Sequence, residues 1–124
     1  MHEEKRLRVL LVDDEKIFLD VLAKRMGRRN MYVTAACGSA EGIQALRNQD
    51  FDVAVTDLKM EKIDGIELMK IFKKMCPDMS VIILTGHGSE DAVEEGMAHG
   101  AFDYLSKPCD LDELVQKIIQ AAGR

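Results

Sequence analysis

The stretch Phe51–Asp57 constrains the fold of this chain more than any other. It is a short apolar run, rich in β-branched residues, and it ends on a carboxylate. Such a run is typical of a strand that is buried on both faces in the middle of a parallel sheet. A charge at the end of a buried strand is costly unless a ligand or a partner uses it. Because ligands of open α/β sheets bind at the carboxyl ends of the strands, Asp57 is the first candidate functional residue.

Four further apolar runs alternate with helical patterns along the chain. They predict strands over Leu7–Val12, Met31–Ala36, Ser80–Thr85 and Phe102–Ser106. The spacing between and after the strands predicts five helices, whose inward-facing residues are Ile17, Phe18, Val21, Leu22 and Met26, then Ile43 and Leu46, then Ile66, Met69, Phe72 and Met75, then Val93 and Met97, and finally Leu111, Leu114, Val115, Ile118 and Ile119. Ser39, Ser89 and Asp110 are the expected N-caps.

Short connections between alternating strands and helices predict one doubly wound (βα)5 domain of the α/β class with a parallel five-stranded sheet. We expect the domain to cover residues 1–124, with its core from about Leu7 to Ala121. Hydrophobic residues make up 47% of the chain and charged residues 31%, mixed in sign, which excludes the disordered class.

The charge and the cysteines exclude several classes of protein. The formal net charge of −5 argues against non-specific binding to nucleic acid or membrane surfaces. No apolar run approaches the roughly 18 residues of a membrane span, and Met1–Arg6 has no apolar signal-peptide core. Cys37, Cys76 and Cys109 show no Cys-x-x-Cys spacing, so we expect free thiols and a cytoplasmic protein.

Polar residues stand at the ends of four predicted strands. Asp13 and Asp14 follow the first strand, Asp57 ends the third, Thr85 ends the fourth and Lys107 follows the fifth. At roughly 5 Å and an effective dielectric constant of about 20, each pair of the three carboxylates repels by ~3 kcal/mol, or about 10 kcal/mol in all. A small domain has a net stability of only about 5–15 kcal/mol. The cluster therefore needs a bound cation, proton uptake or the lysine.

These residue types together indicate phosphoryl transfer. A few partly hydrated carboxylate oxygens suit Mg²⁺ better than Ca²⁺. An aspartate nucleophile, Mg²⁺, a hydroxyl and a lysine can form and hold an aspartyl phosphate. Each residue alone has a simpler explanation: Asp13 or Asp14 could cap the first helix, Asp57 could begin a loop, and Lys107-Pro108 could form a turn. Their joint occurrence at the proper strand ends favours the site.

In combination these residues resemble the receiver domains of two-component response regulators, over nearly the whole chain. The resemblance depends on Asp13-Asp14, Asp57, Asp64-Gly65, Thr85-Gly86, Gly100-Ala101-Phe102-Asp103-Tyr104 and Lys107-Pro108. It implies a flavodoxin-like strand order of 2-1-3-4-5, which is the order of a chemotaxis regulator in the same family. It also implies that the peptide bond before Pro108 is cis, as is frequent in the family.

The resemblance further implies a role for each residue. Asp57 would be the phosphoacceptor. Asp13 and Asp14 would position Mg²⁺, with Asp14, Asp57 and the backbone carbonyl of Lys59 as direct ligands. Thr85 and Lys107 would bind the phosphoryl oxygens, and Tyr104 would swing inward when Thr85 moves.

The implied function is a signalling switch and not a dedicated enzyme, with at most self-phosphorylation and self-dephosphorylation. A sensor histidine kinase or a phosphotransfer protein of a phosphorelay would donate the phosphoryl group. The helix from Ser89, the strand Phe102–Ser106 and the last helix would then change to control a partner or an attached output domain, or to form a phosphorylation-dependent homodimer. The implied partners include no membrane and no nucleic acid bound directly by this domain.

One residue departs from the family pattern. Glu61 stands where family members often have proline, and it adds negative charge near the site. Lys59 and His87 occupy positions that often tune dephosphorylation in the family. The run Leu84–Ser89 resembles receivers that are joined to transcription activators.

Two alternatives come from other classes of protein. A phosphatase of the haloacid-dehalogenase type would need a second aspartate two residues after Asp57, where Lys59 stands. A flavodoxin-like cofactor carrier would need hydroxyl or glycine phosphate binders after the first strand. Asp13 and Asp14 would instead repel a phosphate there.

Overall fold

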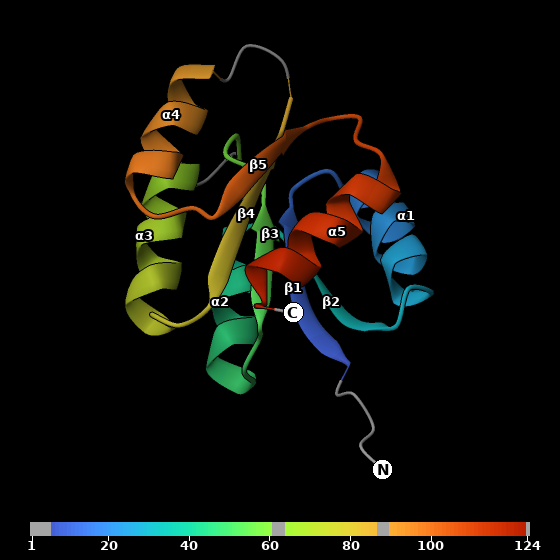
Figure 1. The fold of residues 1–124 in the computed structure, drawn as a ribbon. Helices are drawn as coiled ribbons and strands as arrows, with labels where there is room; N and C mark the ends of the chain where they lie inside the picture. The colour runs from blue at the N-terminus through green and yellow to red at the C-terminus, as the bar shows by residue number, and fades with distance from the viewer. Residues whose placement is uncertain (1–5, 61–63, 87–89, 124) are drawn as a thin grey trace.

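The computed structural model describes residues 6–60, 64–86 and 90–123, in which five strands alternate with five helices (Figure 1). The elements are β1 (Leu7–Asp13), α1 (Lys16–Gly27), β2 (Met31–Cys37), α2 (Ser39–Asn48), β3 (Val53–Thr56), α3 (Gly65–Met75), β4 (Ser80–Thr85), α4 (Glu90–Ala98), β5 (Asp103–Ser106) and α5 (Leu111–Ala121). None of these helices is long and apolar enough to cross a membrane.

The strands form one parallel sheet in the order β2-β1-β3-β4-β5, which confirms the expected fold class and strand order. The strand predicted over Phe51–Asp57 is shorter than expected, because only Val53–Thr56 pair as β3. All four of these residues are buried, as predicted for the central strand of a parallel sheet.

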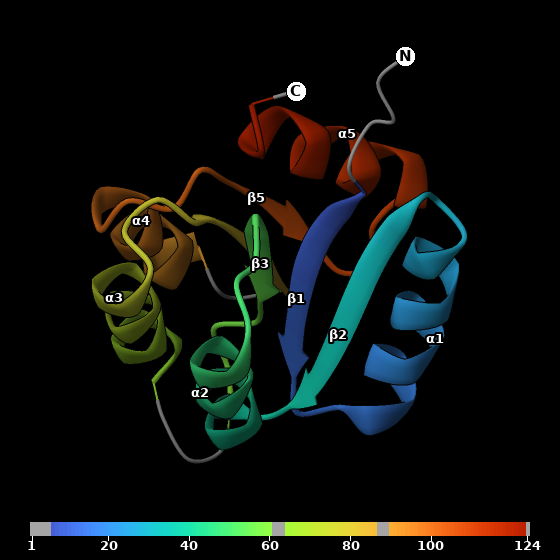
Figure 2. The ribbon, with the colours of Figure 1, turned by 90° about the horizontal axis from the view of Figure 1, so that it is seen from below.

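Helices cover both faces of the sheet (Figure 2). α1 and α5 pack on one face, where Leu22 and Leu114 belong to the same buried cluster as Val9 of β1. α2 and α3 pack on the other face, where Leu46 and Phe72 join a second buried cluster. Helices therefore cover both faces of the sheet. The ends of the strands lie outside the faces that these helices cover, and polar residues can gather there.

The predicted inward face of α1 is wrong in part. Ile17 is 83% exposed and Val21 is 49% exposed, whereas Leu19 is 2% exposed. Leu22 and Met26 are buried as expected. These two residues fit both possible stripes at helical spacing, so periodicity alone could not choose the rotation of the helix. Packing against the sheet selects the stripe that contains Leu19.

The predicted N-cap is confirmed for α5 and wrong for α2. The side chain of Asp110 accepts a hydrogen bond from the Asp112 N–H at 2.9 Å, as a capping residue should. At α2 the N-cap is Gly38 and not Ser39, and Gly38 has a φ of 98°, which favours glycine. The expected cap Ser89 lies outside the described residues.

A capping aspartate also fixes the start of α3, beside the end of β3. Asp64, which belongs to the motifs of the family resemblance, caps α3 by accepting from the Ile66 N–H at 3.0 Å. The Gly65 N–H donates to the Leu58 carbonyl at 3.0 Å. A Cβ added to Gly65 would lie 2.5 Å from that carbonyl oxygen, so only glycine fits. This close approach anchors the chain that follows Asp57.

Candidate functional site

The candidate site lies where the strands of the sheet end. The Asp57 N–H donates to the Val12 carbonyl at 3.2 Å, and the Lys107 N–H donates to the Thr85 carbonyl at 2.8 Å. The hydrogen bonding of the sheet thus continues one residue beyond β3 and β5. The backbones of Asp57 and Lys107 are therefore held by their neighbouring strands.

Asp57 lies at the centre of the site and is only 5% exposed. Its Oδ1 accepts from the Thr85 hydroxyl at 3.1 Å and from the Lys59 N–H at 3.1 Å. Its Oδ2 accepts from the Lys107 ammonium at 2.9 Å. Three separate segments therefore orient this carboxylate.

Lys107 bridges the carboxylates that the sequence placed together. Its Nζ lies 2.6 Å from Asp13 Oδ2, 2.9 Å from Asp57 Oδ2 and 3.7 Å from Glu15 Oε1. The Lys107–Pro108 peptide bond is cis, as the family resemblance implies. The lysine, one of the three expected remedies for the carboxylate repulsion, is in place.

Asp13 belongs to this cluster and does not cap a helix. Its Oδ1 accepts from the Glu15 N–H at 2.9 Å. The N-cap of α1 is Glu15, which makes no side-chain capping bond. The simpler explanation of Asp13 or Asp14 as a helix cap is therefore wrong.

Burial and ion pairing shift the pKa values of Asp13 and Lys107. Burial raises the pKa of Asp13 above its ordinary value of 3.8 and outweighs the hydrogen bond from Lys107, which lowers it. Burial alone would lower the pKa of Lys107. Its hydrogen bonds and attraction to Asp13 and Asp57 overcome that effect, so the pKa rises above the ordinary 10.5. The lysine therefore stays charged at neutral pH.

The carboxylates also form a group that could hold a metal ion. Asp13, Asp14 and Asp57 each offer one oxygen, and these three atoms lie within 4.8 Å of one another. Hard oxygen donors at this spacing fit Mg²⁺. The carbonyl of Lys59 stays a predicted fourth ligand.

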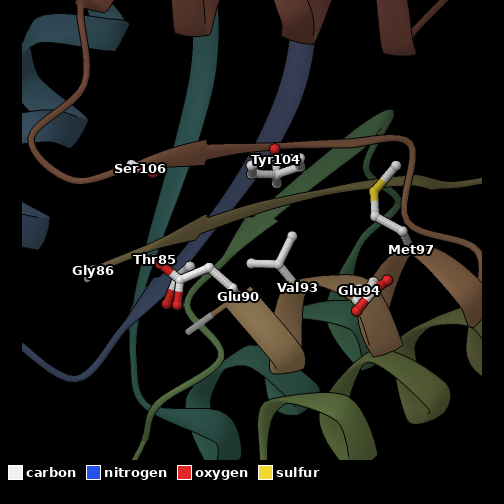
Figure 3. Close-up of a pocket in the computed structure, with 8 residues that line it drawn as sticks. All are labelled: Thr85, Gly86, Glu90, Val93, Glu94, Met97, Tyr104 and Ser106. Atoms are coloured by element: carbon white, nitrogen blue, oxygen red, sulfur yellow. The ribbon is translucent and has the colours of Figure 1, made fainter. Parts of the chain in front are cut away.

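A cavity of about 240 Å³ opens between α4 and β5, next to the cluster (Figure 3). Its lining consists of Thr85, Gly86, Glu90, Val93, Glu94, Met97, Tyr104 and Ser106. Thr85 contributes to both the cavity and the Asp57 contacts. The Tyr104 residue is 46% exposed, so it is turned partly to solvent.

The structure brings together Asp13, Asp14, Asp57, Thr85 and Lys107, as the strand ends predicted. Glu61 and His87 lie outside the described residues. Sequence reasoning missed the ring of Phe18, whose centroid is 4.5 Å from Lys107 Nζ. It also missed the approach of Glu15 to Lys107 at 3.7 Å. No local signal identifies these contacts, because each joins residues that are distant in the sequence.

Comparisons with known proteins point to one family. The sequence model of the response regulator receiver domain matches residues 9–119. The chain is 38% identical over 117 residues to the transcriptional regulatory protein GlrR of Escherichia coli strain K12, covering 94% of this chain and 26% of GlrR. It is 36% identical over 113 residues to the DNA-binding transcriptional regulator NtrC of the same strain, covering 91% of this chain and 24% of NtrC.

The fold of a solved structure points to the same family. The response regulator receiver domain protein from Clostridium thermocellum superposes with a TM-score of 0.90 at 36% identity, covering 95% of both chains. The chain thus spans about a quarter of the length of GlrR and NtrC, but nearly all of this single receiver domain.

The raised pKa of Asp13 generates a prediction on stability. With metal chelated, Asp13 is protonated in both the folded and unfolded states below pH 3.8, and it loses its proton later in the folded state. The unfolded state then binds fewer protons, so this residue reduces stability as the pH rises through its folded pKa. We expect Asp13→Asn to gain stability relative to wild type as the pH rises from 3.8 through the folded-state pKa of Asp13.

Urea unfolding across this range at low salt measures the difference. Asp20→Asn, which removes an exposed carboxylate on α1, is the matched control for the loss of one negative charge. If the wild-type protein instead becomes more stable relative to Asp13→Asn as the pH rises, the raised pKa of Asp13 is contradicted.

Proposed function

Since the chain belongs to the response regulator receiver domain family of two-component signalling, we propose that it is a phosphorylation-dependent switch with Asp57 as the phosphoacceptor. The observation that carries this proposal is the setting of Asp57. Its carboxylate is buried, and each of its oxygens accepts from a side chain at another strand end, Thr85 or Lys107. Such preorganised donors stabilise charge that develops during group transfer.

The proposed step is a phosphoryl transfer to the carboxylate. A carboxylate oxygen of Asp57 attacks the phosphorus of a phosphohistidine on a sensor kinase or phosphotransfer protein. The new O–P bond forms while the P–N bond breaks, and its electron pair leaves with the imidazole. The phosphoryl group of the product carries about −1.5 to −2 charges, where the free carboxylate carried about −1. The Thr85 hydroxyl and the Lys107 ammonium, each 3.1 Å or less from the carboxylate, are placed to meet the new oxygens.

We assign Mg²⁺ to Asp13, Asp14 and Asp57, with the Lys59 carbonyl as a further ligand. The spacing and the hard oxygens of the three carboxylates support this assignment. The ion, when bound, would neutralise negative charge on the carboxylates and the phosphoryl oxygens. Lys107, which contacts both Asp13 and Asp57, supplies a second positive charge.

The domain is a signalling domain. We propose that its own chemistry is limited to self-phosphorylation from small donors and self-dephosphorylation. Lys59 stands where a phosphatase of the haloacid-dehalogenase type needs a second aspartate, which weighs against that alternative. We further propose that it works in the cytoplasm. The net charge of −5 disfavours direct contact with nucleic acid or a membrane.

We propose that the output face is formed by α4, β5 and α5. Thr85 belongs both to the Asp57 contacts and to the cavity between α4 and β5, so its movement would change that cavity. Tyr104 borders the cavity and can turn into it. Within α4 only Gly96 is buried, so this helix is held by few contacts and is easily displaced.

The partner of this face would be a second copy of the domain, an output domain or another protein. Glu90 and Glu94 line the cavity together with Val93 and Met97, and α4 has no basic residue in its last turn. This surface therefore favours a partner that offers an apolar side chain with positive charge around it.

The acceptor is tested by phosphorylation with acetyl phosphate and Mg²⁺, or with a sensor kinase. We expect label to enter wild type and Asp20→Asn equally, and to fall to background in Asp57→Asn, which keeps the shape but lacks the nucleophile. Borohydride trapping and mass spectrometry locate the labelled residue. Label that persists in Asp57→Asn, or maps to another residue, sinks the assignment.

The output face is tested by amide hydrogen exchange with and without beryllofluoride and Mg²⁺. We expect exchange to change in the chain around Asp57 and also across residues 90–106, because Thr85 couples the two. Asp57→Asn should show neither change. If the changes stay within the chain around Asp57, the switch does not use the α4–β5 face.

A further inference from the structure

The aromatic ring of Phe18 lies against the ammonium group of Lys107. The Nζ atom is 4.5 Å from the ring centroid, in addition to its contacts with Asp13 at 2.6 Å and Asp57 at 2.9 Å. A ring face attracts a cation, and the attraction strengthens where water is excluded. The Lys107 side chain is only 14% exposed, so the contact lies in such a place.

We propose that Phe18 is a positioning residue that holds the Lys107 ammonium at Asp57 for phosphoryl transfer. This proposal rests on the proposed function, because Lys107 has to meet the phosphoryl oxygens once Asp57 is modified. A ring face attracts the ammonium without accepting a directed hydrogen bond. The ammonium can therefore move from a carboxylate oxygen to a phosphoryl oxygen while it keeps its contact with the ring.

The orientation of α1 about its own axis brings Phe18 to Lys107. Ile17 is 83% exposed, whereas Phe18 is partly buried and packs against the core between the sheet and α1 and α5. Core packing at this position needs only an apolar side chain of suitable size. It does not need an aromatic face over the ammonium of Lys107, so the two roles can be separated by mutation.

Phe18→Leu keeps the apolar packing and removes the ring face, and Phe18→Tyr keeps the face. With ¹³C-labelled lysine, the ε-methylene signal of Lys107 is assigned by Lys107→Arg. We expect the ring to displace this signal upfield in wild type and in Phe18→Tyr. In Phe18→Leu this upfield displacement should disappear.

The second readout is the rate of phosphorylation by acetyl phosphate at a fixed Mg²⁺ concentration, with each variant shown to be folded. Cation–π contacts of this strength predict a rate about threefold to tenfold lower in Phe18→Leu, restored in Phe18→Tyr. Leu22→Val is the matched control, because Leu22 is buried on the same helix and in the same core cluster. Its rate should equal that of wild type.

The role is overturned if Phe18→Leu keeps either the displaced signal or the wild-type rate, or if Leu22→Val loses as much rate. A wild-type protein that takes up no phosphoryl group at all would overturn the proposed function together with this role. A wild type that is labelled at Asp57, with an unaffected Phe18→Leu variant, would overturn the role of Phe18 alone.

Discussion

The ammonium of Lys107 between Asp13 and Asp57 is the interaction on which the rest of this site depends. Three carboxylates within 4.8 Å of one another would repel strongly, and this single lysine lies within 2.9 Å of two of them. Removing one partner from a buried ion pair typically costs about 3–5 kcal/mol, because the other charge is left uncompensated. That amount is a large part of the about 5–15 kcal/mol that stabilises a small domain. The protein thus carries its own counter-ion beside Asp13 and Asp57.

The parallel sheet places this lysine with little freedom. The hydrogen bond from the Lys107 N–H to the Thr85 carbonyl continues the β4–β5 pairing, and the bond from the Asp57 N–H to the Val12 carbonyl continues the β1–β3 pairing. Main-chain bonds to β1 and β4 therefore hold the backbones of the two charged residues. Because Thr85 also lines the cavity at α4, a change at Asp57 has a short physical path to the surface.

Much of this arrangement could be predicted from the sequence. Buried strands that end on polar residues are a local signal, and the ends of parallel strands meet at one edge, so Asp13, Asp57 and Lys107 were placed together correctly. The rotation of α1 could not be predicted, because two apolar stripes share the same two residues. The contact of Phe18 with Lys107 could not be predicted either, because it joins residues that are distant in the sequence.

The central claim is that Lys107 already balances the charge of the carboxylates that would bind Mg²⁺. Measuring the Mg²⁺ affinity of Lys107→Met against wild type tests it most directly. Loss of a positive charge this close should tighten Mg²⁺ binding by about tenfold or more. Lys117→Met, which removes a lysine paired with Asp103 instead, should bind Mg²⁺ as wild type does. Equal or weaker Mg²⁺ binding by Lys107→Met would contradict the account.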